Sequence, residues 1–218
     1  LSVTLNVKES IHGPIVNDIL STLTTQKPIA MSWIYTQEKN QILDAVYHLS
    51  HSKNVDDFRK SIELIHAPGL NIMYKKKKNN ISWTASGKLY KLDKSINPNF
   101  ILNGSNGIDD QKEFLPFDKN PSALNPSWNY LYSANNQTEA IDGYLYPGYY
   151  LPKDRAERID KLLAPKNNWT KADVEKMIVD NTSSRSSFVV STILPHISLK
   201  NKSKNTQIAF SILSNWNG

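Results

Sequence analysis

The sequence predicts an α+β fold, with strands and helices concentrated in different parts of the chain. Three observations support this prediction. Some stretches alternate apolar and polar residues, as half-buried strands do, whereas others repeat their apolar residues every three to four positions, as amphipathic helices do. Between them, residues 88–128 are rich in Asn, Pro, Gly and Asp. With 218 residues, the chain is long enough for one large domain or two small ones.

Residues 1–35 are expected to form β-strands. Apolar residues alternate with polar ones over residues 1–7, which indicates a half-buried strand. The sequence His12-Gly13-Pro14 is typical of a turn, and a return strand is expected to begin directly after it. A further apolar run with β character covers residues 28–35.

Residues 36–68 are expected to form a pair of helices, because the apolar period changes there from two to about 3.6. Asn54 is a favourable N-cap for the second helix, and Pro68-Gly69 ends it. The residues expected on the inward faces of the two helices are Ile42, Leu43, Val46, Tyr47, Leu49, Phe58, Ile62 and Ile65.

The middle of the chain is expected to hold a β-hairpin over residues 69–87 and a loop layer over residues 88–152. Four lysines, Lys75 to Lys78, fall at the hairpin tip, where a solvated charged turn is the simplest interpretation. The loop layer is interpreted as ordered, because its aromatic residues can anchor it by burial. Residues 130–134 are expected to form a short strand within it.

Residues 153–218 are expected to form helices and a terminal apolar run. Pro152 precedes the first helix, and Thr170 is the expected N-cap of the second, with Val174, Met177 and Ile178 facing inward. The apolar run from Phe188 to Leu194 fits either a helix or a strand.

Composition excludes several classes of chemistry. The chain has no cysteine, so these residues form no disulfide and no thiolate metal site. The net charge is +6, but only four residues are arginine, which makes nucleic-acid binding a weak interpretation. His48 and His51 are three positions apart, but zinc needs a third or fourth ligand and the sequence marks none for this pair. The oxygen-rich stretch 103–110 lacks EF-hand spacing and is interpreted as a polar turn.

A series of short motifs goes further than composition does. Ile11-His12-Gly13-Pro14-Ile15 and the hairpin over residues 71–87 are followed, in order, by Leu115-Pro116-Phe117-Asp118, Leu124-Asn125-Pro126, Tyr130-Leu131-Tyr132-Ser133-Ala134-Asn135-Asn136 and the stretch from Asp154 to Leu163. Each motif alone is weak, but the series in collinear order over nearly the whole chain is fairly specific. The series resembles the penicillin acylase family.

The resemblance implies an N-terminal nucleophile hydrolase with a four-layer αββα sandwich, made as a precursor that cuts itself. In this family an N-terminal Ser attacks an amide carbonyl, and its own α-amino group acts as the base. The motif series implies that Asn135 donates to the oxyanion and that Arg155 orients the catalytic groups. Leu1 has neither hydroxyl nor thiol. We therefore expect an internal segment of the larger chain that is inactive alone, with the nucleophile, the smaller chain and the rest of the larger chain supplied by other sequence.

The resemblance also implies less specific assignments. Leu70 and Val46 match positions of the acyl-pocket wall, with plain core packing as the alternative. The Pro98 carbonyl and the Asp142 carboxylate match donors to a structural calcium ion, and no other cofactor is expected. The expected substrate is a small N-acyl amide of the penicillin, acyl-homoserine lactone or lipopeptide type, without a nucleic-acid or membrane partner.

Family members are usually exported, which implies a periplasmic or secreted protein. The competing hypothesis is a binding module that keeps an acylase-like framework without its chemistry. Such a module would use Trp33, Trp83 and Trp128 as an aromatic ligand surface.

Overall fold

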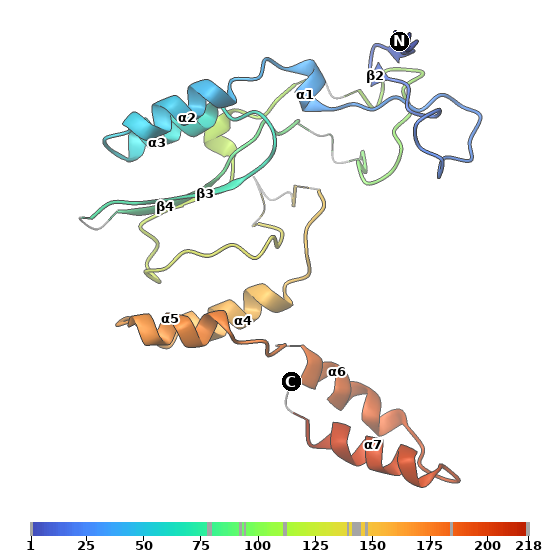
Figure 1. The fold of residues 1–218 in the computed structure, drawn as a ribbon, viewed down its shortest axis with the longest axis vertical. Helices are drawn as coiled ribbons and strands as arrows, with labels where there is room; N and C mark the ends of the chain where they lie inside the picture. Colours follow the sequence, from blue (N-terminus) through green and yellow to red (C-terminus); the bar gives the residue numbers. More distant parts are fainter. Residues whose placement is uncertain are drawn as a thin grey trace. The chain divides into compact units, whose positions relative to one another are not determined.

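The chain divides into two compact units, each with its own helices (Figure 1). The first comprises Leu1–Pro126 and Thr138–Gly148, and the second comprises Ser127–Gln137 and Tyr149–Gly218. This computed structural model describes residues 2–77, 80–91, 93, 95–110, 113–138, 140, 145–146, 148–183 and 185–216.

The helical pair of the first unit is confirmed. It consists of α2 (Ile42–His51) and α3 (Val55–Glu63), preceded by the short α1 (Ile34–Gln37). The side chain of Asn54 accepts hydrogen bonds from the backbone N–H groups of Asp56 and Asp57, each at 2.9 Å, and so caps α3 as predicted. The buried core of this unit consists of Ala45, Phe58, Ile62 and Ile65.

The predicted inward face of α2 is only partly correct. Ile42 and Leu49 pack against the core, whereas Leu43, Val46 and Tyr47 are exposed. The buried face is centred on Ala45, which is completely buried. With Ala45 at the centre of the buried face, the helical period places the side chains of Leu43, Val46 and Tyr47 on the faces that point away from the core.

Three antiparallel strands form the larger sheet of the first unit, in the order β3 (Asn71–Lys75), β4 (Ile81–Ala85) and β5 (Ser122–Leu124). The predicted hairpin is therefore confirmed. Ile72 pairs with Thr84 and Tyr74 pairs with Ser82, so these four side chains share one face of the sheet. Helices α2 and α3 lie along that face in Figure 1, and Ile72 and Tyr74 pack against the helical core.

The turn predicted at His12-Gly13-Pro14 lies earlier, at Ile11 and His12. Gly13 and Pro14 instead form strand β2 (Gly13–Pro14), which pairs with β1 (Glu9–Ser10). Gly13 has a φ of +123°, and a Cβ there would lie 2.3 Å from the Met31 carbonyl oxygen. This position therefore requires glycine.

The strand predicted over residues 1–7 is wrong for residues 2–7, and Leu1 lies outside the described residues. Val3 is 90% exposed and Leu5 is 82% exposed. An alternating pattern indicates a strand only where a neighbouring strand supplies hydrogen bonds, and within the described ranges none pairs with this segment. In the run 28–35, α1 begins at Ile34 and Ala30 makes an isolated bridge to Ile15.

The prediction that buried aromatic residues anchor the loop layer is only partly correct, because Phe114 and Phe117 are half-buried whereas Phe100 and Trp128 are exposed. The Asn120 side-chain amide donates to the carbonyl oxygens of Ala85 (3.0 Å) and Gly87 (2.8 Å), which fastens the loop after the 3₁₀ turn η1 (Phe117–Lys119) to the sheet. Residues 103–110 form the expected polar turn, in which Asp109 accepts from the Asn103 N–H at 2.8 Å. The strand predicted over residues 130–134 is wrong, because this segment makes no ladder and pairing begins at Asn136.

The second unit is helical. It contains α4 (Asp154–Leu163), α5 (Lys171–Ile178), α6 (Ser186–Ile193) with the 3₁₀ turn η2 (Leu194–His196), and α7 (Lys204–Ser214). Thr170 and Asp173 form a capping box at the start of α5, as the predicted N-cap required. The run from Phe188 to Leu194, undecided from sequence, is helical up to Ile193 and enters η2 at Leu194.

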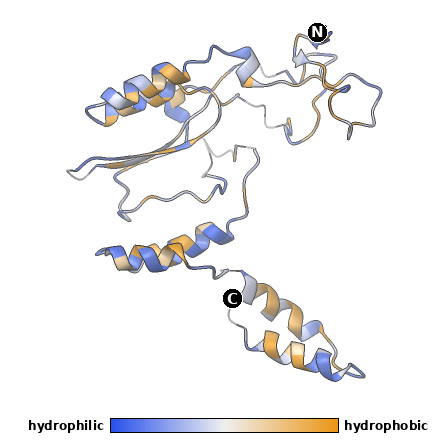
Figure 2. Ribbon diagram, viewed as in Figure 1, coloured by the Kyte–Doolittle hydropathy of each residue, from blue (hydrophilic) through white to orange (hydrophobic). Residues whose placement is uncertain are grey.

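The predicted inward face of α5 is wrong for Val174 and Ile178, which are exposed, although Met177 is partly buried. Helical periodicity identifies an apolar face but does not supply an element to cover it. Helices α6 and α7 also carry exposed apolar side chains, and the hydrophobic colouring runs along both of them in Figure 2. Across the described ranges, every helix is too short or too polar to span a bilayer.

Candidate functional site

The asparagine expected to bind the oxyanion occupies an unusual backbone conformation. Asn135 has a φ of +59°, in the left-handed region that asparagine tolerates better than most residues. Its carbonyl oxygen accepts a hydrogen bond from the Leu151 N–H at 2.8 Å, and Asn136 forms a parallel bridge with Leu151. Ala134 is buried directly before it. The backbone around Asn135 is thus fixed on both sides, while its side chain is exposed.

Arg155 is brought to this asparagine by the start of α4. Its Nη2 donates to the Ala134 carbonyl oxygen at 2.6 Å and to Asn135 Oδ1 at 3.1 Å. The next residue, Ala156, is buried and anchors the first turn of the helix. Two residues that are 20 positions apart in the sequence are therefore in direct contact, while their catalytic roles stay a prediction.

The contact with Arg155 determines which way the Asn135 amide faces. A guanidinium group has only donors, so it pairs with the amide oxygen and leaves the Nδ2 group directed elsewhere. Within the described part of the chain, this NH₂ group has no hydrogen-bond partner. The geometry therefore presents a free, oriented amide donor, which is the kind of group that stabilises a developing oxyanion.

Two further arginines hold α4 in place. Arg158 donates to both carboxylate oxygens of Asp180, from Nε at 2.8 Å and from Nη2 at 2.5 Å. Arg185 binds Glu157 in the same bidentate manner, at 3.2 and 2.5 Å. These pairs connect α4 to the end of α5 and to the start of α6. Sequence reasoning missed them, because their members are 22 and 28 positions apart and no local pattern marks such pairs.

The ion pairs make charged carboxylates part of the support for α4. The hydrogen bonds from Arg158 lower the pKa of Asp180, with a smaller contribution from the Thr182 N–H. The Arg185 side chain likewise lowers the pKa of Glu157. Both carboxylates are therefore expected to be ionised at neutral pH.

We expect the Asp180 pair to make the protein acid-sensitive. A carboxylate whose pKa is lowered in the folded state stabilises the fold above its unfolded pKa of about 3.9, and this stabilisation is lost as the pH falls through the folded pKa. Between pH 5 and pH 3, the Tm of the wild-type protein should fall more steeply than that of an Asp180→Asn variant. Thermal unfolding followed by circular dichroism measures both slopes.

Glu175→Gln is the matched control for that experiment. Glu175 lies 3.6 Å from Lys171 in an exposed i, i+4 pair, which contributes little. Equal acid slopes for wild type and Asp180→Asn would contradict a stabilising role for the Arg158–Asp180 pair.

The other predicted site residues lie in the first unit. Val46 is 56% exposed on α2 and Leu70 is 43% exposed just before β3. The alternative that both are plain core residues is therefore wrong, while their role in an acyl pocket remains a prediction. The Pro98 carbonyl belongs to the loop layer. Asp142 lies outside the described residues.

The calcium prediction lacks a complete set of donors. Calcium takes about six to eight oxygen ligands, and the described ranges supply only the Pro98 carbonyl from the expected pair. No cluster of three or more His, Asp or Glu side chains suited to a metal occurs among those residues. The structural calcium ion therefore stays a prediction.

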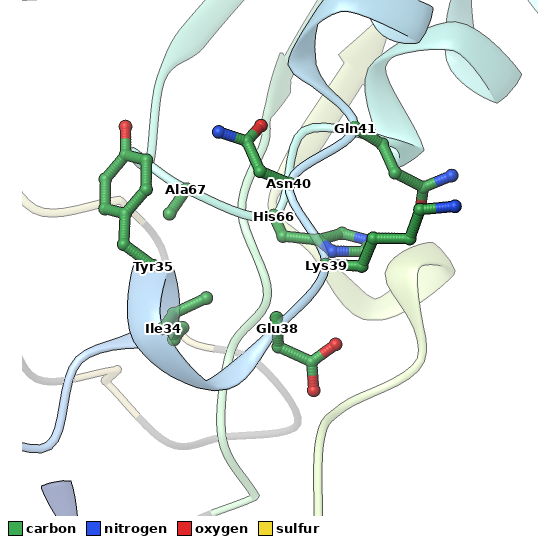
Figure 3. Close-up of a pocket in the computed structure, with 8 residues that line it drawn as sticks. All are labelled: Ile34, Tyr35, Glu38, Lys39, Asn40, Gln41, His66 and Ala67. Atoms are coloured by element: carbon green, nitrogen blue, oxygen red, sulfur yellow. The ribbon is translucent and has the colours of Figure 1, made fainter.

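A small pocket of the first unit is lined by none of the predicted site residues (Figure 3). His66 contributes a buried Nδ1 atom that has no hydrogen-bond partner. The residues that line this pocket come from α1, from the segment that follows α1 and from the loop that follows α3: Ile34, Tyr35, Glu38, Lys39, Asn40, Gln41, His66 and Ala67.

The aromatic surface of the binding-module hypothesis is divided between the units. Trp33 and Trp83 belong to the first unit and Trp128 to the second. The Trp83 indole donates to Asn71 Oδ1 at 2.9 Å, and the Trp33 ring packs edge-on against Tyr35. Two of the three rings therefore have local partners, which explains their positions without a ligand.

The fold has a counterpart in a known acylase. The chain is similar to a solved structure, the thermostable penicillin G acylase from Alcaligenes faecalis, with a TM-score of 0.69 and 17% sequence identity over 97% of this chain. It therefore has the fold of a penicillin acylase. Among curated proteins, the chain is 27% identical over 188 residues to the acyl-homoserine lactone acylase QuiP of Pseudomonas aeruginosa.

The penicillin amidase family matches residues 2–218, so the chain belongs to this family of amidases and acylases. The QuiP match covers 81% of this chain but 22% of QuiP. The chain likewise covers 38% of the penicillin G acylase chain. It therefore spans well under half the length of these relatives.

Proposed function

We propose that these residues form the oxyanion-binding segment of an acylase that hydrolyses N-acyl amides. The single observation that carries this proposal is the hydrogen bond from Arg155 Nη2 to Asn135 Oδ1, which orients the Nδ2 donor of Asn135 and leaves it without a partner among the described residues. The family match over residues 2–218 supports the reaction class. In the proposal, the nucleophile comes from sequence outside residues 1–218.

The proposed reaction has two halves. The hydroxyl of an N-terminal Ser attacks the amide carbonyl, its proton passes to the α-amino group, and a tetrahedral intermediate with a negatively charged oxygen forms. Asn135 Nδ2 donates to that oxygen, while Arg155 holds the amide in place. The C–N bond then breaks and the amine leaves with the proton. Water attacks the resulting ester in the second half, releasing the carboxylic acid and regenerating Ser.

The substrate class follows from the relatives. QuiP is an acyl-homoserine lactone acylase, and the structural neighbour is a penicillin G acylase. We propose small N-acyl amides of these types, with Leu70 and Val46 in the wall of the acyl pocket. At the matching position, members of the family often have an aromatic residue. Val46 is smaller and would leave a roomier acyl pocket, which favours a longer or bulkier acyl group. Export from the cytoplasm and a structural calcium ion are also proposed from the family resemblance alone.

The natural full-length protein that contains these residues provides the test. It is incubated with N-acyl-homoserine lactones of several acyl lengths and with penicillin G, and the released amine and carboxylic acid are quantified by mass spectrometry. We expect hydrolysis of at least one of them by the full-length protein and none by residues 1–218 alone. A full-length protein that binds these amides without hydrolysing them would support the non-catalytic alternative.

A further inference from the structure

A second side-chain contact joins the asparagine segment to the helix that carries Arg155. The Tyr130 hydroxyl donates a hydrogen bond to Asp160 Oδ1. Tyr130 precedes Asn135 in one extended segment, and Asp160 follows Arg155 within α4. The same two pieces of chain are thus connected twice, once at each end of the stretch that leads to Asn135.

We propose that Tyr130 and Asp160 are positioning residues, which form a clamp that holds the Asn135 amide at the geometry set by Arg155. This inference rests on the proposed function, because it concerns the same amide donor. It assigns the two residues no contact with substrate.

The backbone of this segment explains why a clamp is needed. Residues 130–134 form no strand ladder, so regular backbone hydrogen bonds do not hold them. Pairing begins only at Asn136, and the Leu151 N–H bonds the carbonyl of Asn135 itself. Upstream of that point, the Ala134 carbonyl is fixed by Arg155, and Tyr130 is fixed by Asp160. Without the second contact, the segment leading to Asn135 would be tethered at one end only.

The chemistry of the pair keeps the hydrogen bond between Tyr130 and Asp160 in place as the pH changes. The Asp160 carboxylate accepts a hydrogen bond from the Tyr130 hydroxyl, and this bond raises the pKa of that hydroxyl to about 12. The phenol therefore keeps its proton over the pH range in which enzymes work, and the donor is not lost by titration. The Tyr132 ring stacks on Tyr130 with 6.3 Å between the ring centres.

Tyr132 supplies the matched control. It carries the same hydroxyl in the same segment, but within the described ranges that hydroxyl has no hydrogen-bond partner. Tyr132→Phe therefore removes a phenol oxygen and keeps the ring without breaking the clamp. Tyr130→Phe removes the oxygen that binds Asp160.

The test uses the full-length protein and its kcat and KM for a hydrolysed N-acyl amide. Tyr130→Phe and Asp160→Ala should each lower kcat by roughly three- to tenfold, the span of one ordinary hydrogen bond, with a smaller change in KM. Asp160→Asn keeps an acceptor and should recover part of the loss. Tyr132→Phe should stay within about twofold of wild type.

A double variant separates positioning from a general effect on folding. In an Asn135→Ala background the amide that the clamp positions is gone, so Tyr130→Phe should cost no further kcat. An equal loss in both backgrounds would overturn the clamp and leave the proposed function intact. If Asn135→Ala alone left kcat unchanged, the proposed function would fail and the clamp inference with it.

Discussion

Replacing Asn135 with alanine is expected to lower kcat of the full-length acylase by roughly two to three powers of ten, with little change in KM. The Nδ2 group has no partner in the part of the chain that the structure describes, whereas Oδ1 is already bound to Arg155. An oxyanion forms only as the amide carbonyl is attacked, so its donor stabilises the transition state more than the bound substrate. Steady-state hydrolysis of an N-acyl amide measures both constants.

The variant Asn135→Asp tests the role of the NH₂ donor more specifically than alanine does. Aspartate keeps an oxygen acceptor for Arg155 and nearly the same shape, but it lacks the NH₂ donor and adds a negative charge beside the oxyanion. We expect a loss of kcat at least as large as for alanine. Asn136→Ala is the control, because the Asn136 amide already donates to the Gln137 carbonyl at 3.2 Å. A kcat within threefold of wild type for both Asn135 variants would show that another group binds the oxyanion.

Arg155→Ala is expected to have the second-largest effect, a loss of kcat of about ten- to a hundredfold. The substitution removes two hydrogen bonds at once and leaves the Ala134 carbonyl and Asn135 Oδ1 without their donor. The Asn135 amide is then free to rotate, and in half of its orientations it presents an oxygen to the oxyanion. Arg155→Lys keeps the charge without the planar guanidinium and should fall between alanine and wild type.

Arg185→Ala controls for the loss of a positive charge in the same unit. Arg185 pairs with Glu157 on α4 and makes no hydrogen bond to Asn135. We expect its kcat to stay near the wild-type value, with a small decrease in Tm. In a double variant with Asn135→Ala, Arg155→Ala should add little, because it acts through that amide. Fully additive losses would mean that Arg155 has a separate function, such as binding the substrate directly.

Local signals explain which parts of the fold were predictable. The caps at Asn54 and Thr170 and the hairpin over residues 69–87 depend on residues close in sequence, and all three are present. The strands expected at residues 1–7 and 130–134 required a partner strand that no local pattern specifies. The exposure of Val46 also depended on tertiary packing, since Ala45 occupies the buried centre of the helix face.

The candidate site shows the same division. Asn135 and Arg155 were selected from the order of the motif series, not from spacing or periodicity. Their hydrogen bond and the free Nδ2 group required coordinates. The Arg158–Asp180 and Tyr130–Asp160 contacts were not predicted, because each joins residues that are 22 and 30 positions apart, respectively.

The left-handed backbone at Asn135 has a consequence for how this sequence can change over time. Among the described residues, every non-glycine residue with a positive φ is an asparagine: Asn125, Asn129, Asn135 and Asn201. At Asn135 the main chain and the proposed chemistry require the same residue. Glycine would satisfy the backbone but supply no amide, and glutamine would supply an amide but fit the left-handed region poorly. Substitutions of Asn135 are therefore not expected to be neutral, even though its side chain is exposed.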